Sequence, residues 1–130
     1  MDTNINVLIV DDYNTMLRII RTFLLQIGFK NISEAYYGEE ALEKLCTGYY
    51  GLVISDWNMS PMSRLELVEA VRAGAALAHL PFILVTAEGK AEKVVAAKAA
   101  NVDNYIVKPF NAATLECKAS AVLKRRAADG

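Results

Sequence analysis

The sequence predicts an α/β fold in which a five-stranded parallel sheet carries helices on both faces. Short, β-branched apolar runs alternate five times with segments whose apolar residues recur at helical spacing. Because consecutive parallel strands join through right-handed crossovers, this alternation leaves few packings other than a parallel sheet between two helical layers. The 130 residues suffice to bury one core. We therefore expect one domain over residues 1–130, with no separate output domain.

The expected strands are short and mostly apolar. Nearly unbroken apolar runs indicate strands that are covered on both faces, and only the second strand has a weak pattern. The five segments are Ile5–Val10, a segment near Ile32–Tyr36, Leu52–Ser55, Phe82–Val85 and Tyr105–Val107.

The expected helices follow from period and end signals. In the first, the inward positions recur every three or four residues and Gly28 stands where a C-terminal glycine belongs; these positions are Met16, Leu17, Ile20, Phe23, Leu24 and Ile27. The others are Glu39–Cys46, Leu65–Arg72, Ala91–Ala100 and Ala112–Arg126. Ser63 with Glu66 predicts a capping box for the third helix, and Asn111 a cap for the fifth.

Composition excludes several classes of protein. A net charge of −1 gives no general reason to bind nucleic acid or an anionic membrane. Cys46 and Cys117 form no metal-ligand pattern, which favours a reduced, cytoplasmic protein. No segment is typical of a signal peptide or a transmembrane helix.

Chemically active residues stand where the predicted strands end. In open parallel sheets, ligands bind outside the carboxyl ends of the strands. The residues at these ends are Asp11 and Asp12 after the first strand, Asp56 after the third, Thr86 after the fourth, and Lys108 and Pro109 after the fifth. We expect three carboxylates, a hydroxyl and an ammonium to gather at one edge.

Such a cluster restricts the chemistry. Three neighbouring carboxylates repel one another unless some protonate or a cation joins them. Mg²⁺ suits the position because it binds a few carboxylate oxygens and keeps places for water and phosphate. The Asp56 carboxylate is then a competent nucleophile toward a phosphoryl group, with Lys108 and Thr86 neutralising the charge that develops.

Each residue also has a simpler explanation. A single aspartate after a strand is usually a turn residue or a helix cap, and the pair Asp11–Asp12 would then only cap the first helix. Thr86 would bond to backbone, and Lys108 would be solvated. All four strand ends, however, carry a residue type that phosphoryl transfer requires. This joint occurrence favours a chemical role for these residues over the simpler explanations.

These residues resemble the receiver domain of two-component response regulators over essentially the whole chain. The resemblance implies a three-layer, flavodoxin-like (βα)5 fold with strand order 2-1-3-4-5. It also implies that Asp56 is the phosphoacceptor, that Asp11, Asp12, Asp56 and the backbone carbonyl of Asn58 hold Mg²⁺, and that Lys108 contacts the phosphoryl group. The Lys108–Pro109 bond would be cis.

The same resemblance implies a switch. Thr86 would move toward the phosphoryl oxygens, and Tyr105 would fill the vacated space. The signal would then reach a surface made of the fourth predicted helix, the fifth strand and the fifth helix, with charge added by Lys90, Lys93 and Lys118. Asn58 and Glu88 would tune hydrolysis.

The implied partner is a histidine kinase, and the domain catalyses only its own phosphorylation and dephosphorylation rather than substrate turnover. Three segments look most like the single-domain chemotaxis regulators: Asp56–Met59, Thr86–Glu88 and Lys108–Phe110. A flagellar motor switch protein would then be the output partner of a monomer. A phosphorelay intermediate that meets a histidine phosphotransferase, or a phosphate sink, stays an alternative.

One stretch departs from the family. The usual Met-Pro-x-Met-Asp/Asn-Gly is replaced by Met59–Arg64, with Arg64 at the glycine position. We expect this loop to differ, and a degenerate receiver that acts by binding alone stays open. Two rivals have less support: a flavin or nucleotide binder lacks a glycine-rich phosphate loop, and an Asp-x-Asp phosphatase would need an acid where Asn58 stands.

Overall fold

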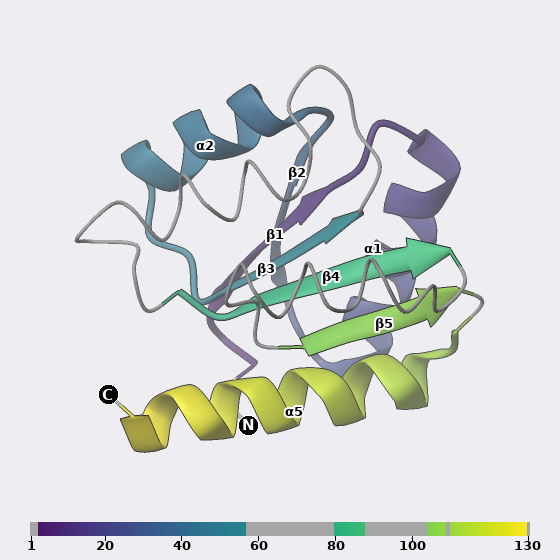
Figure 1. The fold of residues 1–130 in the computed structure, drawn as a ribbon, viewed down its shortest axis with the longest axis vertical. Coiled ribbons are helices and arrows are strands. Elements are labelled where there is room, and N and C mark those ends of the chain that lie inside the picture. The colour runs from purple at the N-terminus through teal and green to yellow at the C-terminus, as the bar shows by residue number, and fades with distance from the viewer. Residues whose placement is uncertain (1–2, 57–79, 88–103, 109, 130) are drawn as a thin grey trace.

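The computed structural model describes residues 3–56, 80–87, 104–108 and 110–129, and Figure 1 shows their arrangement. The strands are β1 (Asn6–Val10), β2 (Asn31–Ala35), β3 (Leu52–Asp56), β4 (Phe82–Ala87) and β5 (Asn104–Lys108). The helices are α1 (Asn14–Ile27), α2 (Gly38–Thr47) and α5 (Ala112–Asp129). The predicted helices Leu65–Arg72 and Ala91–Ala100, with the Ser63–Glu66 capping box, lie outside the described residues.

The five strands form one sheet with the order β2-β1-β3-β4-β5. Each of the four neighbouring pairs is parallel. The predicted fold class and strand order are therefore confirmed. Because all strands run the same way, their carboxyl ends meet at a single edge of the sheet.

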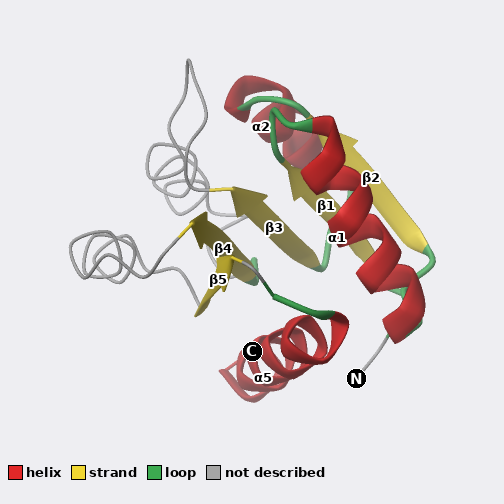
Figure 2. Ribbon diagram, turned by 90° about the vertical axis from the view of Figure 1, so that its right-hand side faces the viewer, coloured by secondary structure: helices red, strands yellow, loops and turns green. Residues whose placement is uncertain are grey.

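The sheet separates two apolar cores. Alternate residues of a strand face opposite sides, so in β1 Leu8 and Val10 join one core whereas Val7 and Ile9 join the other. Helix α2 covers the first core, and α1 and α5 cover the second (Figure 2). This double coverage explains why the β1 run is apolar without interruption.

The predicted inward face of α1 is confirmed. Leu17, Ile20 and Leu24 are buried in the core beneath α1 and α5, and Met16, Phe23 and Ile27 are partly buried against it. The helix ends at Gly28, whose φ of 121° is rarely accessible to other residues and whose N–H donates to the Leu24 and Leu25 carbonyls. Asn111 caps α5, since its Oδ1 accepts the Thr114 N–H at 2.8 Å.

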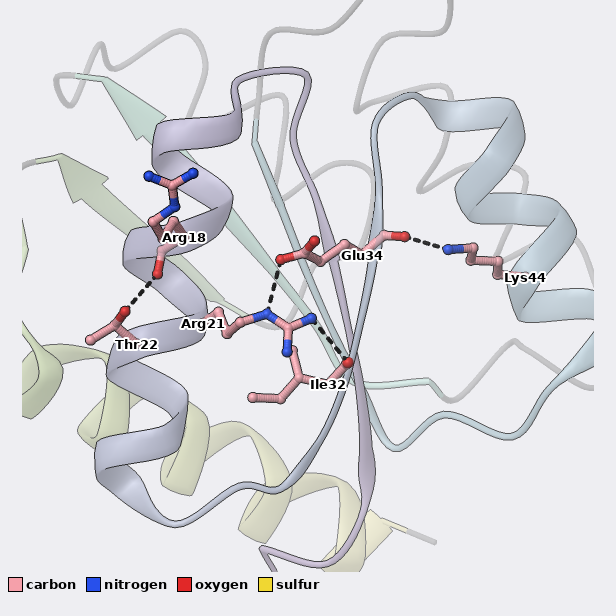
Figure 3. A network of polar contacts seen from close by, with 6 residues as sticks. All are labelled: Arg18, Arg21, Thr22, Ile32, Glu34 and Lys44. Carbon is pink, nitrogen blue, oxygen red and sulfur yellow. Dashed lines mark hydrogen bonds and ion pairs between the residues drawn. The ribbon is translucent and has the colours of Figure 1, made fainter.

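The outer edge of β2 is closed by cations, as Figure 3 shows. The Ala35 carbonyl accepts the Asp11 N–H and so faces β1. Because successive peptide groups alternate in direction, the Ile32 and Glu34 carbonyls face outward. Arg21 of α1 donates to the first at 3.3 Å, and Lys44 of α2 donates to the second. Both outward carbonyls are therefore engaged, which protects an edge strand from pairing with another chain.

Candidate functional site

The acidic pair Asp11–Asp12 stands directly after β1, at the carboxyl edge of the sheet. Asp11 is only 1% exposed, whereas Asp12 is exposed. The Asp11 Oδ1 accepts the Tyr13 N–H at 2.9 Å, and its own N–H donates to the Ala35 carbonyl at 3.1 Å. The backbone of β2 and the turn into α1 therefore fix the position of the Asp11 carboxylate.

The structure does not support the simpler explanation that Asp11 and Asp12 serve only to cap α1. The N-cap residue is Tyr13, whose side chain makes no capping hydrogen bond, and no acidic residue lies in the first turn. Capping therefore does not account for Asp11 or Asp12. A buried carboxylate is costly unless polar groups or cations compensate it, so its position favours a role in the site.

The backbone register brings the other candidate positions to the same edge. Val10 pairs with Ser55, so Asp11 and Asp56 follow at adjacent positions of neighbouring strands. Asp56 pairs with Val85, the residue before Thr86, and Lys108 pairs with Ala87. The side chains of Asp56, Thr86 and Lys108 lie outside what the structure describes, so their roles stay predictions.

Several expected site features fall on residues that the structure does not describe. They are Asn58, Glu88, Pro109 with its expected cis bond, Lys90, Lys93 and the Met59–Arg64 segment. Among the described residues, no group of three or more His, Cys, Asp or Glu side chains forms a metal site. The proposed ligand set includes Asp56 and Asn58, so this finding leaves it as a prediction.

Tyr105, the expected aromatic switch, is the second residue of β5 and is half-buried. It packs against the core beneath α2, and it pairs in register with Leu84 of β4. The Lys118 Nζ lies 5.6 Å from the centroid of its ring. Lys118 is therefore half-buried beside this ring rather than fully surrounded by solvent.

Sequence reasoning missed the contact that anchors the turn after Lys108. The Phe110 ring meets Phe23 of α1 edge-to-face, with centroids 5.7 Å apart and an interplanar angle of 68°. Phe23 was expected to face inward, but nothing in the sequence pairs it with Phe110. The contact ties Phe110, just before α5, to the second half of α1.

Within the described part of the chain, none of the helices has the length and apolar content needed to cross a bilayer.

Comparison with known proteins agrees with this arrangement. Residues 7–120 match the family model of the response regulator receiver domain. The chain is 43% identical over 125 residues to chemotaxis protein CheY-3 of Vibrio cholerae, covering 96% of each chain. It is 44% identical over 119 residues to chemotaxis protein CheY of Pseudomonas aeruginosa, covering 92% of this chain and 96% of that one.

Solved structures give the same result. The chemotaxis response regulator CheY4 of Vibrio cholerae superposes with a TM-score of 0.85 at 33% identity, over 92% of this chain and 99% of that one. A response regulator from Chloroflexus aurantiacus reaches 0.89 at 26% identity, over 93% and 98%. The family match covers most of the chain, and the fold, strand order and acidic pair at the carboxyl edge agree with it. The chain therefore belongs to the response regulator receiver domain family.

Proposed function

We propose that this response regulator accepts a phosphoryl group from a histidine kinase on Asp56 and works in chemotaxis signalling. The observation that supports the acceptor most directly is the register between β1 and β3. It sets the buried Asp11 carboxylate next to the position of Asp56, at the edge where ligands of open parallel sheets bind.

The donor set fits Mg²⁺. The carboxylates of Asp11, Asp12 and Asp56 and the carbonyl of Asn58 offer oxygen ligands only, which is what this hard cation prefers. Asp11 is held by hydrogen bonds and Asp12 is open to solvent, so a bound ion would keep water in part of its shell. When bound, Mg²⁺ would neutralise charge on the phosphoryl oxygens.

The transfer step balances as follows. An Asp56 carboxylate oxygen attacks the phosphorus, and the P–N bond of the phosphohistidine breaks. The imidazole nitrogen keeps the bonding pair, so the ring leaves as neutral imidazole when its other nitrogen carries a proton, and otherwise takes a proton from water. Lys108 and Thr86 act on the phosphoryl oxygens by charge and hydrogen bonding. Hydrolysis returns the Asp56 carboxylate and inorganic phosphate, with Asn58 and Glu88 beside the path of the attacking water.

The output is a change at the Tyr105 side of the molecule. Thr86 moves toward the phosphoryl oxygens, and Tyr105 fills the space that it leaves. The surface that changes includes β5 and α5, together with the predicted helix Ala91–Ala100. A partner reads the change only if it has different affinities for the two Tyr105 arrangements.

A role in chemotaxis is supported by the names of the two sequence relatives described above, both of which are chemotaxis CheY proteins. The corresponding output partner is a flagellar motor switch protein. Pull-down of a motor switch protein by the protein treated with BeF₃⁻ and Mg²⁺, but not by untreated protein, is the expected result. Capture of a histidine phosphotransferase in place of the switch protein would favour a relay role.

Trp57 follows the acceptor directly and provides the test of phosphorylation. Titration with BeF₃⁻ is expected to change Trp57 fluorescence in the presence of Mg²⁺ and to leave it unchanged after chelation. Asp56→Asn is expected to abolish the response. The matched control is Asp129→Asn, which removes a carboxylate at the far end of α5 and should respond as the native protein does. A native protein that never responds would favour a degenerate receiver.

A further inference from the structure

Lys118 reaches Tyr105 around the outer edge of the sheet. Strand β5 is the last strand in the order, so one of its sides has no neighbouring strand. Its Ile106 packs into the core beneath α1 and α5, whereas Tyr105 packs against the core beneath α2. Successive residues of a strand face opposite sides. Tyr105 therefore lies on the face of the sheet that α5 does not cover.

Lys118 belongs to α5, and its helix position is fixed by packing. Leu115 and Ala119, three residues before and one after it, are fully buried in the core beneath α1 and α5. The Lys118 Nζ nevertheless lies 5.6 Å from the centroid of the Tyr105 ring. The long side chain must therefore pass the edge of β5, so that one residue of α5 links the two faces of the sheet.

The contact has the geometry of a cation–π interaction, in which a cation within about 6 Å of a ring centroid is attracted by the electrons of the ring face. Both residues are half-buried, so water screens the attraction less than it would at an open surface. Interactions of this kind change an equilibrium between two ring positions by about two- to five-fold. That is enough to bias a side chain that has two accessible arrangements.

We propose that Lys118 is a positioning residue that holds the Tyr105 ring in the arrangement seen here and so sets the threshold of the switch. This inference rests on the proposed function, in which Tyr105 leaves that arrangement when Asp56 carries a phosphoryl group. Loss of the Lys118 charge then makes the movement of the Tyr105 ring easier. An arginine at position 118, which is a cation of similar length, preserves the threshold of the switch.

The first test observes the ring without any phosphoryl analogue. The protein is labelled with 3-fluorotyrosine, and the ¹⁹F resonance of Tyr105 is identified among the six tyrosines by its loss in Tyr105→Phe. We expect Lys118→Met to move this resonance, with the ratio of the two ring arrangements changing by about two- to five-fold. Lys118→Arg should restore the native position. The matched control is Lys124→Met, an exposed lysine of the same helix.

Three results would overturn the proposal. One is a Tyr105 resonance that stays in place in Lys118→Met. Another is an equal displacement in Lys124→Met, which would indicate a general charge effect. The third is an equal displacement in Lys118→Arg, which would indicate packing rather than charge. The thermal unfolding midpoint of Lys118→Met should fall by at most about 4 °C relative to Lys124→Met, which is the cost of losing one such contact, whereas a larger fall would indicate a general structural role.

The second test couples the ring to the site. With Mg²⁺ present, the BeF₃⁻ concentration that half-saturates the Tyr105 response should fall by about two- to five-fold in Lys118→Met. An unchanged or increased concentration would overturn the threshold role. If Trp57 of the native protein does not respond to BeF₃⁻, the proposed function fails, whereas the ring-position measurement without BeF₃⁻ still decides whether Lys118 holds Tyr105.

Discussion

Replacing Arg21 by methionine measures how much the polar network over β2 stabilises the fold. The Arg21 Nε lies 3.0 Å from the Glu34 Oε2, and the two side chains are 40% and 27% exposed. Solvent screens an ion pair whose side chains are this exposed, so we expect a coupling free energy of about 0.3–1 kcal/mol. The hydrogen bond to the Ile32 carbonyl, at 3.3 Å, adds about 0.5 kcal/mol.

The total loss for Arg21→Met is therefore about 1 kcal/mol. With an unfolding entropy of about 2.1 cal/mol/K per residue, 130 residues give about 0.27 kcal/mol/K. The expected fall in the unfolding midpoint is about 4 °C. Methionine keeps much of the apolar stem, so the change removes mainly the charge and the donors.

The assay is a double-mutant cycle. Urea unfolding of the native protein, Arg21→Met, Glu34→Gln and the double variant yields the coupling free energy. Concentrated salt should reduce it, because both side chains reach solvent. Arg18→Met, which removes an exposed arginine one turn earlier, should change stability by less than about 0.5 kcal/mol. A coupling above about 2 kcal/mol, or an equal loss in Arg18→Met, would refute the reasoning.

Three further predictions concern the fold around the site. Removing both edge cations in Arg21→Met/Lys44→Met exposes the β2 carbonyls, so concentration-dependent self-association is expected in size-exclusion chromatography while each single variant stays monomeric. Asn111→Ala removes the cap of α5 and should cost about 1 kcal/mol in urea unfolding, whereas Asn111→Ser should cost far less. Gly51→Ala places a Cβ 2.8 Å from the Ile5 Cβ, and the overpacking should cost about 1–3 kcal/mol.

Each of these predictions has a contrary outcome. A double edge variant that elutes as a monomer at every concentration would show that the cations do not protect β2. Equal stability of the alanine and serine variants at position 111 would remove the capping argument. A stable Gly51→Ala protein would mean that Ile5 moves aside at little cost.

The fold could be predicted because its strands lie between two helical layers. β1, β3 and β4 must be apolar on both faces, and such runs are unmistakable in a sequence. β2 was the weakest prediction because its sequence, NISEA, has only one buried residue and otherwise lies partly or fully exposed at the sheet edge. Its predicted end at Tyr36 was one residue too far, since the Tyr36 N–H donates to the Glu40 Oε1 instead of the sheet.

The site could be predicted only as far as strand ends determine it. Asp11 follows β1, and topology alone brings it to the edge where Asp56 ends β3. The contacts that hold the surroundings in place depend on distances that no local pattern records. Arg21 reaches Glu34 across 13 residues, and Lys118 reaches Tyr105 around the sheet edge. Long side chains can form such contacts only after the backbone has folded.

Intact mass spectrometry after incubation with acetyl phosphate tests the acceptor most directly. With Mg²⁺ present, we predict that the native protein gains the mass of one phosphoryl group, that peptide mapping assigns it to Asp56, and that Asp56→Asn gains none. Asp11→Asn should gain far less than the native protein, and chelation should abolish the gain. Equal phosphorylation of Asp56→Asn, or a gain that does not depend on Mg²⁺, would contradict the account.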